Sequence, residues 1–270
     1  MEAARLVVER SGLGRRIVEV DDADDYVCRP HAPGEIREAL VERHLTVVHR
    51  RGKSMWCETS SRRSRRGSGP SLGIHLGMSG QVVVLEADGT VTDEGGDYQG
   101  AQGASSLPDP TRWSRFCLTF ADGAQLHLVD KRRLGRVRLD PDLGGLGPDA
   151  GEIGREEFRD RVGRGTAPLK ARLLDQSTLA GVGNLLADEA LWQSGISPTR
   201  PAREMSAQEL DRLRRRLRQS IRRAVRLGGV HTGEMIEHRR IGAHCPRCGA
   251  EMRRATVGGR TTWWCPQEQT

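Results

Sequence analysis

The amino-acid sequence predicts an α+β protein, with a β-sandwich in the N-terminal half and helices in the C-terminal half. Between residues 15 and 140, short apolar or alternating runs are separated by turn-forming residues, which is typical of strands. Beyond this region the apolar period becomes helical. The length of 270 residues suffices for two domains with a core each.

The N-terminal half begins with a short helical pattern over residues 2–10. The strand candidates that follow are "RRIVEV", "LTVVHR", "SMWCET", "LGIHLGM", "QVVVLE", "RFCLTF", "AQLHLVD" and "RVRLD". Several short strands at this spacing indicate a sandwich or a barrel. The segments "SSRRSRRGSGPS" and "GGDYQGAQGASS" are expected to be loops. We therefore expect a β-sandwich domain over residues 1–141 and a linker over 142–154.

The clearest helix of the sequence lies in the C-terminal half, in the stretch of residues 206–229. Ser206 followed by Glu209 forms a capping box, and Gly228 is the expected C-cap. The apolar positions recur at helical spacing, at Leu210, Leu213, Leu217, Ile221 and Val225. We expect a helical domain over residues 155–242, followed by a β-hairpin over residues 243–270.

The charge balance favours a polyanionic partner. Lys and Arg total 43 against 36 Asp and Glu, and the net charge is +7. Residues 199–227 carry ten arginines and three acidic residues, a distribution typical of a nucleic-acid-binding face. An ordinary solvated helix face is the alternative for any one of these arginines.

No apolar run is long enough to span a bilayer, and the N-terminus "MEAARLVVER" lacks the pattern of a secretory signal. We therefore expect a cytoplasmic protein with reduced thiols. Three of the six cysteines, Cys28, Cys57 and Cys117, lie in apolar or strand-like contexts and are expected to be buried.

The stretch "LLDQSTLAGVGNLLADEAL" predicts a helix, a tight turn and a second helix. Gly181 and Gly183 in the turn allow close approach of the backbone, and the N–H groups that open the second helix favour an anion. Asn184 adds a side-chain amide to this candidate phosphate site. An ordinary helical hairpin with a capping asparagine is the alternative.

Five blocks in order resemble the formamidopyrimidine-DNA glycosylase/endonuclease VIII family, and they span nearly the whole chain. They are "RRGKSMW", "LGIHLGMSGQV", "DKRRLGRVRL", "LLDQSTLAGVGNLLADEALWQSGISP" and "CPRCGAEMRRATVGGRTTWWCP". The resemblance implies a monomeric base excision repair protein, with a helix–two-turn–helix and a zinc finger, that binds double-stranded DNA containing damaged bases or abasic sites. It implies removal of oxidised bases and strand cleavage through a Schiff base, with DNA running between the two domains.

The resemblance also assigns individual residues. Lys53 matches the active-site lysine, with a plain surface lysine as the alternative, and Arg260 matches the arginine that the finger presents to DNA. Met78, Arg132 and Leu134 match the residues that fill the gap left by an everted base. Leu134 departs from the usual phenylalanine, but an aliphatic wedge still unstacks bases. The remaining DNA-binding positions are Lys170, Gly183 and Asn184.

The finger departs from a four-cysteine pattern. Cys245 and Cys248 form half of a zinc knuckle, and Cys265 supplies a third thiolate. The expected fourth ligand is Glu268, with His244 as the competing ligand and a metal-free hairpin as the alternative. The segment 228–244 is also short beside family members that cap oxidised guanine there, which favours oxidised pyrimidines or abasic sites.

Family members begin "MPELPEVE", where the proline amine is the nucleophile and the next glutamate is the acid/base group. Matching "GRRI" places Met1 and Glu2 on the "VE" that ends this segment. We hypothesise that "MPELPE" precedes Met1; the alternative is a lesion- or structure-binding DNA protein without the chemistry. A zinc-finger transcription regulator is disfavoured, since no recognition-helix pattern accompanies the finger.

Overall fold

The computed structural model describes residues 1–61, 68–96 and 109–270. The chain forms two compact units, Met1–Leu143 and Gly144–Thr270. The two predicted loops "SSRRSRRGSGPS" and "GGDYQGAQGASS" extend into residues outside the described ranges.

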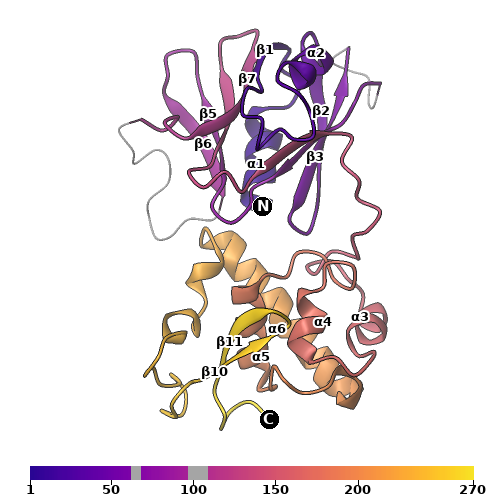
Figure 1. The fold of residues 1–270 in the computed structure, drawn as a ribbon, viewed down its shortest axis with the longest axis vertical. Coiled ribbons are helices and arrows are strands. Elements are labelled where there is room, and N and C mark those ends of the chain that lie inside the picture. Colours follow the sequence, from indigo (N-terminus) through magenta and orange to yellow (C-terminus); the bar gives the residue numbers. More distant parts are fainter. Residues whose placement is uncertain (62–67, 97–108) are drawn as a thin grey trace. The chain divides into compact units, whose positions relative to one another are not determined.

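Unit 1 is a sandwich of two antiparallel sheets (Figure 1). One sheet has the strand order β1-β7-β8-β5-β6, and the other has the order β2-β3-β4-β9. The predicted α+β class with an N-terminal β-sandwich is therefore confirmed. The strands are β1 (Ile17–Asp21), β2 (His44–Arg51), β3 (Ser54–Ser60), β4 (Leu72–His75), β5 (Gln81–Leu85), β6 (Val91–Gly96), β7 (Ser114–Phe120), β8 (Gln125–Val129) and β9 (Arg136–Leu139).

The core of unit 1 is formed by apolar side chains that alternate along these strands, together with the helices α1 (Glu2–Ser11) and α2 (Glu35–Leu40). Cys28 and Cys57 are fully buried and Cys117 is 7% exposed, as the sequence predicted. The sequence pattern did not indicate β6, which contains the polar run Thr92-Asp93-Glu94. This strand lies beside α1, and a Cβ atom on Gly95 would stand 2.6 Å from the carbonyl carbon of Ala3. A small residue is required at that contact.

Unit 2 carries the helices α3 (Arg155–Val162), α4 (Leu169–Leu174), α5 (Asn184–Ser194) and α6 (Ala207–Arg226). Short 3₁₀ turns lie at Ala202–Glu204, Val230–Thr232 and Ile236–His238. Ser206 caps α6, and the reciprocal bonds between Ser206 and Glu209 confirm the predicted capping box. The C-cap is Leu227, and Gly228 follows it with a φ of +84°. Val225 is 38% exposed, so the buried stripe ends before the last turn.

The C-terminal hairpin consists of β10 (Arg253–Val257) and β11 (Arg260–Trp264), paired from Arg253–Trp264 to Val257–Arg260. Gly258 and Gly259 make the turn, both at positive φ. A Cβ atom on Gly258 would lie 3.0 Å from Cα of Ala171 in α4. The tip of the hairpin therefore lies directly against α4.

Candidate nucleic-acid interface

Two apolar side chains project into solvent from neighbouring loops of unit 1. Met78 follows β4 and is 69% exposed, and Leu134 precedes β9 and is 37% exposed. The loops pack closely: a Cβ atom on Gly77 would stand 2.5 Å from the carbonyl carbon of Leu134, and Gly77 adopts a φ of +63°. Exposed large apolar groups on a tightly packed support have the form of a wedge for unstacking bases.

The buried carboxylate of Asp130, which the sequence analysis did not single out, holds both loops. Its Oδ2 accepts hydrogen bonds of 2.7 Å from the N–H groups of Leu134 and Gly135. Its Oδ1 accepts from the Ser79 hydroxyl and the Arg132 N–H. The Arg132 guanidinium in turn donates to the Ser79 hydroxyl at 3.0 Å. The three predicted gap-filling residues thus share one support.

Lys53 lies in the turn between β2 and β3 and is half-buried. Burial, together with the positive charges of Lys53, Arg136 and the N-terminal amine, lowers the pKa of His75. The Nδ1 atom of His75 accepts a hydrogen bond from the Gly77 N–H at 3.0 Å, which leaves Nε2 as the donor of a neutral ring. His75 therefore lies near the positive charge of Lys53. In the sequence, His75 stands out only as a polar residue at the end of the apolar strand β4.

Glu2 is occupied by structural ion pairs. One carboxylate oxygen binds the Arg5 guanidinium at 2.9 Å, and the other binds that of Arg50 at 2.6 Å. Arg50 also donates to the carbonyl of Gly52, next to Lys53. Glu2 thus holds α1 to β2.

In unit 2, the N-terminus of α5 is open. Gly183 is its N-cap, no side chain caps it, and no acidic residue lies in its first turn. Such a terminus presents unpaired N–H groups and a positive dipole end. Asn184 is the first residue of the helix, and its Nδ2 donates to the Thr261 carbonyl at 3.0 Å. Arg260 directly precedes Thr261 and is exposed. The structure therefore brings Gly183, Asn184 and Arg260 together.

Lys170 does not fit the structure as a direct DNA contact, because its side chain is fully buried. The ammonium lies 2.6 Å from Asp188 Oδ1 and donates to the Thr262 hydroxyl at 2.7 Å. Burial lowers the pKa of Lys170 and raises that of Asp188, while their mutual attraction opposes both shifts. The sequence did not reveal this partner, which lies in the next helix.

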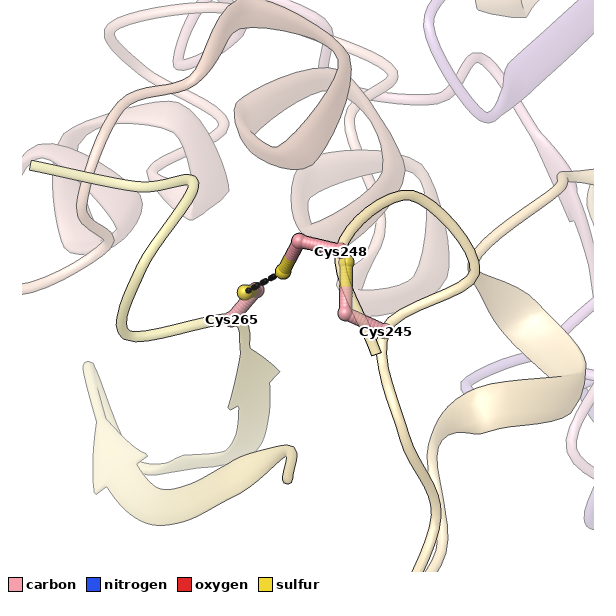
Figure 2. Close-up of side chains that lie close together, drawn as sticks. All are labelled: Cys245, Cys248 and Cys265. Carbon is pink, nitrogen blue, oxygen red and sulfur yellow. Dashed lines mark hydrogen bonds between the residues drawn. The ribbon is translucent and has the colours of Figure 1, made fainter. Parts of the chain in front are cut away.

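The three C-terminal cysteines converge (Figure 2). Their sulfur atoms all lie within 4.8 Å of one another, and the thiols of Cys248 and Cys265 are 3.4 Å apart. Cys245 and Cys265 are buried, and Cys248 is exposed. Three thiols at this separation suit a thiophilic metal ion. Neither the Glu268 carboxylate nor His244 belongs to this group within the described parts of the chain. Glu268 instead donates its backbone N–H to the Cys265 sulfur at 3.4 Å.

Comparison with known proteins decides the family. Residues 1–137 match the model of the formamidopyrimidine-DNA glycosylase N-terminal domain, and residues 145–235 match that of the formamidopyrimidine-DNA glycosylase H2TH domain. The chain belongs to the formamidopyrimidine-DNA glycosylase family. The helix–turn–helix of α4 and α5 is accordingly part of the family's H2TH domain.

Individual family members align over almost the full chain. A formamidopyrimidine-DNA glycosylase of Nocardioides sp. is 31% identical over 98% of this chain and 91% of its own length. One from Pelotomaculum thermopropionicum is 28% identical over 98% of this chain and 96% of its own length. The structure of Lactococcus lactis Fpg with abasic-site DNA superposes with a TM-score of 0.76 at 23% identity, covering 100% of this chain and 97% of that one. Within the described residues, no helix combines the length and the apolar character needed to cross a membrane.

Proposed function

We propose that this protein acts in DNA base excision repair, removing oxidised bases and cleaving the strand at abasic sites. The observation that carries the proposal is the exposed pair Met78 and Leu134 on loops that the buried Asp130 holds in place. An enzyme that acts on a base must take it out of the stack and fill the gap. Glycosylases of the same family are the matching relatives, and one superposable structure holds abasic-site DNA.

In this proposal the two units contribute different contacts. Met78, Arg132 and Leu134 fill the gap in the duplex, while Lys53 and His75 lie at the reacting sugar and its phosphate. Gly183, Asn184 and Arg260 bind a phosphate next to the lesion, through an open helix N-terminus and a guanidinium. Phosphate contacts of this kind position the DNA without reading its sequence.

The chemistry requires an amine that attacks the sugar carbon and forms a Schiff base, which then serves as the electron sink for elimination. In the family pattern this amine belongs to the proline of "PELPE", and the protein prepared for the test carries that segment ahead of Met1. Lys53 and the N-terminal amine both lower the pKa of His75 through their positive charge.

We also propose that the finger binds zinc. The thiolates of Cys245, Cys248 and Cys265 supply three ligands, and Glu268 supplies the fourth by rotation of its side chain from a backbone that already contacts the Cys265 sulfur. Zinc would fix the hairpin that carries Arg260. Metal-loaded and chelated protein, compared by metal analysis and by thermal unfolding, test this assignment.

The function is tested by incision of duplexes that carry an abasic site, an oxidised pyrimidine, 8-oxoguanine or no lesion. The protein is prepared with "MPELPE" before Met1, and a Lys53→Met variant is compared with Arg164→Met, which removes an exposed charge of unit 2. We expect incision of the lesion duplexes, with oxidised pyrimidines and abasic sites preferred, and loss of activity only in Lys53→Met. Binding of lesion DNA without any incision would instead support a non-catalytic DNA-binding protein.

A further inference from the structure

A buried carboxylate in α5 connects three other parts of unit 2. Asp188 is 1% exposed, and its Oδ1 lies 2.6 Å from the Lys170 ammonium of α4. Its Oδ2 accepts from the Arg239 guanidinium at 3.0 Å and from the Trp263 N–H of β11 at 3.4 Å. One side chain therefore ties α4 and the segment around Arg239 to the hairpin.

The same cations converge on the backbone beside Arg260. The carbonyl of Thr261 accepts from Asn184 at 3.0 Å, from Lys170 at 3.3 Å and from Arg239 at 3.4 Å. The Lys170 ammonium also binds the hydroxyl of Thr262. The peptide that follows Arg260 is thus held from two helices and a loop.

Two cationic groups, Lys170 and Arg239, face one carboxylate, Asp188, among the ion pairs of the described residues. The Lys170 and Asp188 side chains have no solvent exposure. Charges in a low-dielectric interior interact strongly and remain costly when unbalanced. An anion bound above Asn184 and Arg260 would offset the excess.

We propose that Asp188 is a positioning residue for the phosphate-binding surface. Together with Lys170 and Arg239 it fixes the Thr261 carbonyl, and so sets Arg260 at a defined place beside Asn184. The inference rests on the proposed function, because it concerns how the same phosphate site is built. In this proposal the buried Lys170 supports the phosphate-binding surface and does not contact DNA itself.

The arrangement has a consequence for Asn184. Its amide Nδ2 is bound to the Thr261 carbonyl in this structure. When the amide turns to a phosphate, Lys170 and Arg239 still donate to that carbonyl. The carbonyl therefore keeps two donors, and release of the Asn184 amide does not leave it without a hydrogen bond.

The test measures binding of the full-length protein to a fluorescent duplex carrying a tetrahydrofuran abasic-site analogue, by anisotropy over a range of salt concentrations. Asp188→Asn is compared with Asp211→Asn, which breaks the Arg159–Asp211 ion pair of the same unit. We expect Asp188→Asn to weaken binding about tenfold and to lower the salt slope by about 1, as loss of one phosphate contact does. Asp211→Asn should leave both unchanged.

A double-mutant cycle with Arg260→Ala separates positioning from a general structural effect. Arg260→Ala should weaken binding about tenfold in the parent and less than about threefold in Asp188→Asn, since groups in one network are not additive. Equal losses in both backgrounds would overturn the proposal. If Asp188→Asn does not fold, the pair Lys170→Met/Asp188→Leu removes both charges and is read in the same way. A parent protein that fails to bind the duplex would contradict the proposed function instead.

Discussion

The hydroxyl of Ser79 donates a 3.2 Å hydrogen bond to the buried carboxylate of Asp130. This bond joins the loop of Met78 to the loop of Leu134, because the other oxygen of Asp130 binds the Leu134 N–H. Two exposed apolar side chains therefore share one rigid support. Rigid placement matters for a wedge, since a side chain that yields cannot keep two bases apart.

Replacing Asp130 by Asn is expected to loosen this support. The amide would bring N–H donors toward backbone N–H groups that now bind an oxygen, and we expect a loss of about 2 kcal/mol in the free energy of unfolding. Urea unfolding measures the loss. Asp109→Asn, at an exposed turn, is the matched control and should change the stability by less than about 0.5 kcal/mol. Equal stability of the two variants would refute the assigned role of Asp130.

Leu134 is expected to act on DNA and not on folding. Leu134→Ala should reduce base unstacking opposite an abasic-site analogue, followed by 2-aminopurine fluorescence, while Leu134→Phe should match or exceed the parent. Because the side chain is 37% exposed, the stability should change by less than about 0.5 kcal/mol. Val18→Ala, at an equally exposed apolar residue of β1, should leave the fluorescence signal unchanged. A similar signal from Leu134→Ala and the parent would exclude the wedge role.

Glu209 gives a stability that depends on pH. Desolvation raises its pKa, but hydrogen bonds from Ser206 and the ion pair with Arg200 outweigh this effect and lower the pKa to about 2 from an ordinary 4.5. Its contribution is therefore complete above pH 4.5 and is lost as the pH falls toward 2. We expect Glu209→Gln to reduce the free energy of unfolding by about 1 kcal/mol at neutral pH, a typical capping contribution, and by much less near pH 2. Exposed Glu204→Gln should show no such pH dependence.

Glu268, the proposed fourth ligand of the finger, can be exchanged. Glu268→Cys should bind zinc more tightly than the parent, because it completes a four-thiolate site, and Glu268→Ala should bind it more weakly. Competition with a chromogenic chelator ranks the three proteins. Cys265→Ser should lose the metal and lower the unfolding temperature. Parent-like zinc affinity in Glu268→Ala would remove Glu268 from the ligand set.

Much of the fold followed from local patterns. Alternating apolar residues located eight strands, and the pair Ser206 and Glu209 located the start of α6, because both signals lie within a few residues of sequence. Strand β6 escaped because an edge strand tolerates the polar run 92–94, and its place is fixed by contact with α1. Such a contact joins residues far apart in the chain and leaves no local pattern.

The candidate site likewise contains residues that the sequence predicts and residues that only the structure shows. Exposed Met78, Leu134 and Arg260 were found through family blocks, which record residue types at fixed places. The side chains that position them could not be predicted. Asp130 binds backbone N–H groups of its loop, and Asp188 in α5 binds Lys170 in α4, so neither contact leaves a pattern in the local sequence. Lys170 shows most clearly what the sequence does not reveal. A lysine in a buried ion pair cannot be told from a surface lysine by residue type alone.

We infer that the protein, when preceded by "MPELPE", cleaves abasic DNA through a Schiff base on its N-terminal proline. The most direct measurement is borohydride trapping on a duplex with a natural abasic site, using the chain preceded by "MPELPE" and the chain starting at Met1, followed by mass mapping of the adduct. We predict a covalent adduct on the proline of the longer chain and at most a trace on Lys53 of the shorter one. Absence of an adduct from the longer chain, under conditions where it binds the DNA, would contradict it.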